Sequence, residues 1–265
     1  MTDPATRTSY EPVKVTAHLA HGYATAHPWG LALDGILAAE IWHTMVADSE
    51  ATDSDEELPR PGTTPNPPDL PLPLARCTPT ARPDLWHWAA TCSQPVGAHR
   101  TEIHHRGRYL DHRAIEQLTR TVLPASLPSR SGPYRGRWMP LIVTVCSAVT
   151  WSAIGDPDQI RQLLTPIAAI GKKRSRGEGT VTRWDVSLTS RDPHDAAHLH
   201  LDGTLGRPCP PTCVVDGLRR GEPVRAGLRP PYMHPSRQAD LYLPTFLDDL
   251  GDAHHPDADG RAAAR

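Results

Sequence analysis

The sequence is poor in aromatic residues and has few apolar residues overall. Its 265 residues include a single Phe, aromatic side chains make up 5% of the chain, and apolar residues make up 38%. This composition excludes a large core of aromatic side chains, and the 29 prolines indicate long irregular segments. We therefore expect a modest core, in one large domain or two small ones.

The chain also lacks long apolar runs and a paired cysteine pattern. No run approaches the roughly 20 apolar residues that a membrane-spanning helix needs, and residues 1–11 contain no apolar stretch typical of a signal peptide. We therefore predict a cytoplasmic protein without a membrane partner. A reducing compartment also fits the cysteines, which are odd in number and scattered: Cys77, Cys92, Cys146, Cys209 and Cys213.

Net charge is nearly absent, at −2, so the total charge does not indicate a nucleic-acid partner. The distribution of charge is more informative. Acidic residues gather in residues 48–57, whereas basic residues gather in residues 100–137 and 172–183. Local basic patches attract polyanions even when the whole chain is close to neutral.

The most distinctive stretch is a basic loop bracketed by glycines, between a predicted helix at 156–170 and a predicted strand at 180–190. Lys and Arg donate to phosphate oxygens, and Gly allows positive φ and close backbone approach. The order helix–loop–strand excludes a Walker loop, which precedes a helix. A solvated basic loop with a Gly C-cap at Gly171 is the alternative. The candidate RNA-binding residues here are Gly171, Lys172, Lys173, Arg174, Ser175, Arg176, Gly177 and Gly179.

A second basic region mixes cations with aromatic rings. Cations follow phosphates and rings stack on bases, which suits single-stranded nucleic acid. A solvated hairpin edge is the alternative. The candidate RNA-binding residues in this region are Arg100, His104, His105, Arg106, Arg108, Tyr109, Arg113, Tyr134, Arg135 and Arg137.

Periodicity predicts six elements in the order strand, helix, strand, strand, helix, strand. The strands are predicted at 13–19, 85–92, 139–149 and 180–190, and the third, which is the most apolar, is predicted to be central in the sheet. Asp34 is a plausible N-cap for the first helix, whose apolar stripe runs from Ile36 to Met45. Asp156 caps the second, and Pro166 should kink it or end its regular part early. This order predicts an α+β fold of the ferredoxin-like, RRM-like βαββαβ type.

The predicted domain spans residues 1–193. Within it, the acidic and Pro-rich stretch 48–83 cannot bury much and is predicted to be an insertion or mobile loop. Residues 194–265 are predicted to form an irregular extension that packs back on the body, with 251–265 disordered.

On these features the chain resembles the RAMP superfamily of CRISPR-associated proteins. The Gly-rich basic loop after the second helix carries the resemblance, together with residues 33–38 (LDGILA) and Pro230-Pro231-Tyr232. Within the superfamily, the chain is most similar to the type IV (Csf group) Cas-five-like subunit, which caps the 5′ handle of the guide RNA. The likeness covers residues 13–47 and 85–245. Residues 48–83 and the His-rich tail match no motif of the family.

The resemblance implies a non-enzymatic subunit of a type IV CRISPR ribonucleoprotein, with no cofactor. Its partners would be guide RNA and other Cas subunits, especially the backbone subunit that it abuts. Matched to this sequence, the side chains of Lys172, Lys173, Arg174 and Arg176 would contact the 5′ handle, and so would backbone amides near Gly177 and Gly179.

Three other functions stay open. Some RAMP relatives cut precursor RNA without metal, and His104, His105, Tyr109 and Lys172 would supply the acid and base for such a cut. A zinc site is possible from His194, His198, Cys209 and Cys213, although prolines separate the cysteines. The basic patches would also suit an interaction protein that binds acidic protein surfaces without RNA.

Overall fold

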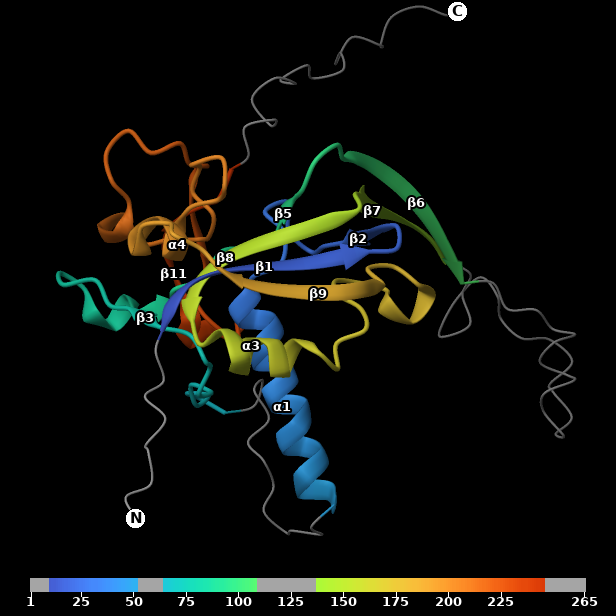
Figure 1. Cartoon of the computed structure of the whole chain (residues 1–265), viewed down its shortest axis with the longest axis horizontal. Helices are drawn as coiled ribbons and strands as arrows, with labels where there is room; N and C mark the ends of the chain where they lie inside the picture. The colour runs from blue at the N-terminus through green and yellow to red at the C-terminus, as the bar shows by residue number, and fades with distance from the viewer. Residues whose placement is uncertain (1–9, 52–63, 109–136, 246–265) are drawn as a thin grey trace, which may run out of the picture.

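The computed structural model describes residues 10–51, 64–108 and 137–245. Its largest sheet has four antiparallel strands in the order β5 (Gln94–Pro95), β8 (Ala148–Gly155), β1 (Glu11–Leu19) and β9 (Val181–Leu188) (Figure 1). The predicted strands at 13–19 and 180–190 are confirmed as β1 and β9. The fold is mixed α+β with antiparallel sheets, as the sequence predicted.

Alternating side chains on β1 decide which face of this sheet is buried. Val13, Val15 and Ala17 have no exposed surface, while Lys14 between them is exposed. Side chains of α1 (Leu33–Ala51) and α3 (Pro157–Leu164) join the same core cluster, and Figure 1 shows both helices on one side of the sheet. The opposite face of β8 is covered by residues 191–200, where Arg191 donates to Ser152 Oγ at 2.8 Å.

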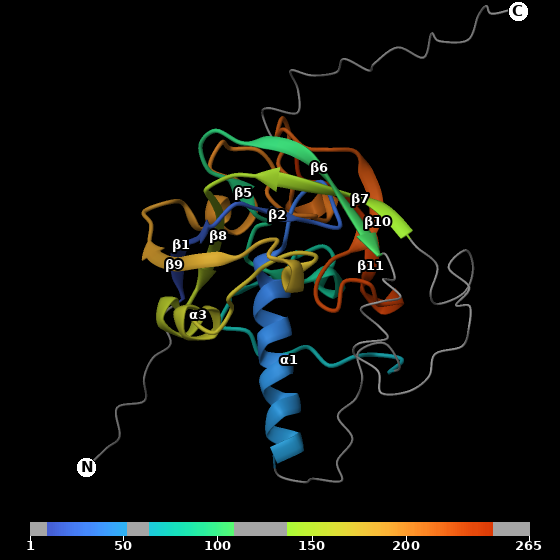
Figure 2. The ribbon, with the colours of Figure 1, turned by 90° about the vertical axis from the view of Figure 1, so that its right-hand side faces the viewer.

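The two predicted helices form with changes at their ends. Asp34 is not an N-cap, because α1 begins at Leu33. The predicted stripe residue Met45 is exposed, since the second half of α1 extends away from the body (Figure 2). Asp156 does cap α3: its carboxylate accepts the amides of Asp158 and Gln159, each at 3.0 Å. The helix ends at Leu164 rather than 170, two residues before Pro166, which has no amide to continue it.

The predicted strand at 139–149 is instead two strands in two sheets. It breaks at Cys146 and Ser147, so that β7 (Arg137–Val145) lies between β2 (Gly22–Ala24) and β6 (Arg100–Arg108), whereas β8 joins the main sheet. The run is mostly apolar, but Met139 and Ile142 are more than half exposed on β7. The apolar pattern therefore gave no sign that the chain bends here and passes from one sheet to another.

The predicted strand at 85–92 and the predicted insertion at 48–83 also need correction. The first region holds a 3-10 turn, η1 (Pro83–Leu85), and the two-residue strand β4 (His87–Trp88), which pairs with β3 (Arg76–Cys77). The second strand of the main sheet is β5 instead. Within the predicted insertion, residues 48–51 belong to α1, and Leu72 and Leu74 are buried in the core.

The C-terminal part packs on this body through short elements. They are α4 (Pro193–His198), the 3-10 turns η4 (Pro211–Cys213) and η5 (Pro235–Arg237), and the hairpin of β10 (Pro223–Gly227) and β11 (Gln238–Tyr242). Leu205, Leu228 and Leu241 are buried there. Across the described ranges, every helix is too short or too polar to span a bilayer.

Candidate nucleic-acid interface

Two glycines give the basic loop its shape. Gly171 and Gly179 both have positive φ, at 79° and 69°. A Cβ at Gly171 would overlap the carbonyl oxygen of Ala24, and a Cβ at Gly179 would overlap that of Ile170. Between them, Lys173 has φ of 60° and leads into a single 3-10 turn, η3 (Arg174–Arg176). The loop can therefore lie against neighbouring backbone only because these two positions lack side chains.

Backbone hydrogen bonds fix the loop on β2. Lys172 N–H donates to Ala24 O at 2.7 Å, and Gly179 N–H donates to Gly22 O at 2.8 Å. Gly177 N–H donates to Arg174 O at 3.0 Å. The amides of Gly177 and Gly179 are therefore engaged inside the protein, and RNA contact by other backbone amides near these glycines stays a prediction. The glycines position the loop, and the side chains of residues 172–176 are exposed.

The cations of the loop are exposed, and none is neutralised by a carboxylate of the described chain. Lys172, Lys173, Arg174, Ser175 and Arg176 are all exposed, and none of the four cations forms an ion pair with a described residue. Exposed cations held by an ordered backbone are suited to bind phosphate groups.

A groove of about 870 Å³ runs along one side of this loop. Its cations are Lys172, Arg174 and Arg225, the last from β10. Lys173 and Arg176 do not line it. The sequence gave no reason to select Arg225, because it comes from the irregular C-terminal part. The remaining walls come from residues 26–32, the first turns of α1, residues 166–171 and the segment around Met233.

Two stacked rings form part of the groove wall. The rings of His27 and Trp29 lie 4.5 Å apart between centroids and within 10° of parallel. Burial, followed by the charge of Lys172, lowers the pKa of His27, so the ring stays neutral near pH 7. Flat neutral rings beside cations can stack on bases while the cations bind phosphates. Sequence reasoning missed both residues, and the signal that was available is a Trp within the loop His27-Pro28-Trp29-Gly30.

The second predicted patch meets the loop through β6. His104 Nδ1 lies 3.2 Å from Oε1 of Glu178, a buried residue of the glycine loop, and its Nε2 lies 3.2 Å from Glu102 Oε2. Arg100 pairs with the same Glu102 at 2.6 Å, and His105 is exposed. His104 thus connects β6 to the loop through its contact with Glu178. Arg100 is already paired with the carboxylate of Glu102.

The other members of that patch contribute no described side chain. Arg106, Arg108 and Arg137 belong to the backbones of β6 and β7. The remaining candidates, Tyr109, Arg113, Tyr134 and Arg135, lie outside the described residues.

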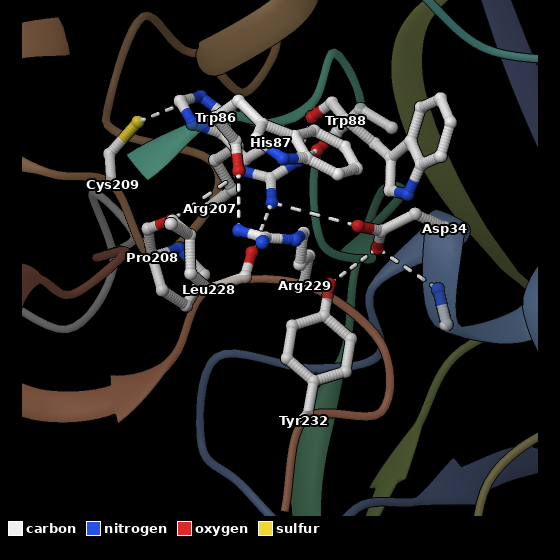
Figure 3. A network of polar contacts seen from close by, with 12 residues as sticks. Asp34, Trp86, His87, Trp88, Arg207, Pro208, Cys209, Leu228, Arg229 and Tyr232 are labelled. Carbon is white, nitrogen blue, oxygen red and sulfur yellow. Dashed lines mark hydrogen bonds and ion pairs between the residues drawn. The ribbon is translucent and has the colours of Figure 1, made fainter. Parts of the chain in front are cut away.

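A buried polar network borders the groove and joins the motifs LDGILA and Pro-Pro-Tyr, which lie almost 200 residues apart in the chain. Figure 3 shows the Tyr232 hydroxyl directed at Asp34, where it donates to Oδ1 at 2.5 Å. Arg207 Nη2 lies 3.6 Å from Asp34 Oδ2 and donates to Leu228 O at 3.0 Å. Burial raises the pKa of Asp34, and the charge of Arg207 opposes this effect. The network fixes the start of α1 to the C-terminal part.

A separate cluster of Cys and His side chains lies within the C-terminal part and the β3–β4 hairpin. Potential ligand atoms of Cys77, His87, His198 and Cys213 all lie within 4.8 Å of one another. Two of the residues considered for zinc from the sequence, His198 and Cys213, belong to it. His194 and Cys209 do not complete this set of four; Cys77 and His87 take their places.

Comparison with known proteins identifies no relative of this chain. No protein-family model matches the chain, and no curated protein has a significantly similar sequence.

Proposed function

We propose that this chain is an RNA-binding, non-catalytic subunit of a type IV CRISPR ribonucleoprotein. In this proposal it holds the 5′ end of the guide RNA and contacts the backbone subunit, in the cytoplasm. The observation that carries the proposal is the groove beside the glycine loop. There, Lys172, Arg174 and Arg225 face one space with the stacked pair His27 and Trp29.

The strand order supports a ferredoxin-like domain of the RAMP type. In the main sheet, β8 separates β1 from β5, and β1 separates β8 from β9. A helix connects the members of each separated pair, α1 in the first case and α3 in the second. Two interleaved βαβ units of this kind are the split βαβ plan. In that plan the basic loop follows the second helix, as it does in the family that the sequence resembles.

The proposed binding mode combines charge with stacking. The loop cations neutralise phosphates of a single strand, and release of counterions makes the affinity depend on salt. His27 and Trp29 offer ring faces to bases without selecting a sequence. Rigid anchoring of the loop on β2 reduces the entropy that binding would otherwise cost.

The geometry gives less support to an endoribonuclease. A general base needs a ring nitrogen directed at the substrate. Both ring nitrogens of His104 are instead directed at carboxylates, those of Glu102 and Glu178. We therefore take RNA cleavage as an outcome to be tested and not as a second proposal.

The test compares two double variants of the same loop. Lys172→Ala/Arg174→Ala removes the two groove cations, and Lys173→Ala/Arg176→Ala removes the same charge from the loop outside the groove. We expect the first to weaken binding of a precursor RNA about 100-fold at low salt and to reduce the salt slope by about 2. The second should weaken binding by less than about tenfold. Fluorescence anisotropy across a salt series measures both quantities.

The same samples distinguish the other functions. An RNA of equal length and composition with a scrambled 5′ end tests whether the repeat-derived end is preferred. A denaturing gel of RNA incubated in magnesium-free buffer should show intact RNA; one discrete cut would replace the proposal by the nuclease. Equal affinity of wild type and both variants for RNA would contradict the assignment of the groove.

A further inference from the structure

We propose that Cys77, His87, His198 and Cys213 form a structural zinc site, independent of the RNA-binding proposal. Three separate segments supply the ligands. Cys77 and His87 are directly opposite partners on the β3–β4 hairpin, His198 is the last residue of α4, and Cys213 is the last residue of η4. Directly opposite residues on paired strands place their side chains on one face, which brings the first two together.

The distances fit a tetrahedral ion. Zn–S bonds of about 2.3 Å and Zn–N bonds of about 2.0–2.1 Å, at tetrahedral angles, separate two sulfurs by about 3.8 Å and two nitrogens by about 3.3 Å. The Sγ atoms of Cys77 and Cys213 lie 3.8 Å apart, and the Nε2 atoms of His87 and His198 lie 3.2 Å apart. Two sulfurs and two nitrogens in this arrangement favour zinc among the common metals.

Hydrogen bonds orient both histidines for ligation through Nε2. His87 Nδ1 lies 3.2 Å from Leu85 O, and His198 Nδ1 lies 3.0 Å from His194 O. A carbonyl oxygen only accepts, so each Nδ1 must carry the proton. When both rings are neutral, each directs an Nε2 lone pair at the other ring, and two acceptors cannot bond to each other. A cation between them satisfies both, and a carbonyl partner on the second nitrogen is typical of zinc-bound His.

The position of the cluster indicates a structural role. The two histidines are buried and the two cysteines are partly buried, so four protein ligands close the site and leave no position for substrate. Zinc would join residues 136 positions apart in the chain and hold the β3–β4 hairpin to the C-terminal part. Cys209 is also buried, with Sγ 3.7 Å from His87 Nε2, but it is not among the four. It therefore offers a matched control.

Metal analysis of the tag-free, full-length chain purified under reducing conditions tests the proposal. We expect about one zinc per chain, retained in Cys209→Ala and reduced at least tenfold in Cys213→Ser. Removal of zinc with a chelator should lower the Tm by about 5–10 °C, and added zinc should restore it. Zinc retained equally in Cys213→Ser would overturn the assignment.

A measurement on the wild-type chain keeps the proposal testable if Cys213→Ser does not fold. Cobalt exchanged for zinc should give the intense visible absorption of a tetrahedral ion with thiolate ligands. Failure of the reduced wild-type chain to bind zinc or cobalt would overturn the proposal. So would mass-spectrometric detection of a Cys77–Cys213 disulfide in the protein as purified with reductant. None of these outcomes depends on RNA binding.

Discussion

At the scale of single residues, the glycines of the basic loop differ in what they do. Gly179 has positive φ and lies against the backbone of Ile170, so any side chain there meets both strain and overlap. Gly177 also has positive φ, at 86°, but a Cβ there would have open space around it. Gly179 therefore determines how the loop packs against neighbouring backbone. Gly177 determines only how the loop turns.

This difference gives a matched pair of variants. Gly177→Ala should cost about 1–2 kcal/mol, the usual penalty for a side chain in the left-handed region. Gly179→Ala should cost more, about 3–5 kcal/mol, because backbone overlap adds to the same strain. Urea denaturation followed by tryptophan fluorescence measures both. Equal losses of stability in the two variants would show that the contact with Ile170 does not constrain the loop.

At the scale of elements, α3 shows how a short sequence defines a helix. Asp156 caps it, Pro157 takes the first position, and Ile160 and Leu164 lie on the buried face. Hydrogen bonds from the amide of Gln159 lower the pKa of the Asp156 carboxyl below its ordinary value of 3.8. Since the folded pKa is the lower one, this carboxylate stabilises the fold above that value and loses its effect as the pH falls through the folded pKa.

Replacement of this cap should therefore have an effect that depends on pH. Asp156→Ala should lower the free energy of unfolding by about 1 kcal/mol at neutral pH. The difference from wild type should hold down to about pH 5 and shrink below the ordinary carboxyl pKa. Asp156→Asn keeps a cap oxygen without a charge, so it should lose less at neutral pH, and its difference from wild type should also shrink below the ordinary carboxyl pKa. Thermal melts of the three proteins between pH 3 and pH 7 measure this, and a constant difference for Asp156→Ala would refute it.

At the scale of the whole molecule, the groove is assembled from parts of the chain that are distant in sequence. Residues 26–32, the segment before and within the basic loop, and β10 each supply one wall. The network of Asp34, Arg207 and Tyr232 holds the first turns of α1 against the C-terminal part beside it. Under the proposed function, RNA affinity should depend on the rings of the groove as well as on the loop cations.

Removing one ring tests that dependence. Trp29→Ala should weaken RNA binding about 5- to 150-fold, because stacking on one base contributes about 1–3 kcal/mol. The slope of affinity against salt should stay unchanged, since no phosphate contact is lost. Tyr10→Ala removes an exposed ring next to the first residue of β1 and should bind RNA as wild type does. Anisotropy titrations compare the three proteins, and wild-type affinity for Trp29→Ala would exclude the stacking role.

Local patterns predicted the elements whose cause is local. Alternation in β1, the cap of α3 and the glycines of the basic loop are signals within a few residues of one another, and each is confirmed. The same approach failed at residues 139–149, where an apolar run does not reveal that the chain passes from one sheet to another. It also failed at Leu72 and Leu74, since a composition rich in proline does not indicate which apolar side chains reach the core.

By itself, the sequence determined the α+β class, the strands β1 and β9 of the main sheet, and a basic loop shaped by glycine. Only the tertiary structure decided that Lys172 and Arg174 share a groove with Trp29 and Arg225. It also decided that Cys77 and His87, rather than His194 and Cys209, complete the cluster with His198 and Cys213. The physical reason is the range of the interactions: dihedral preferences and capping act between near neighbours, whereas a site is made by side chains that folding brings together from distant segments.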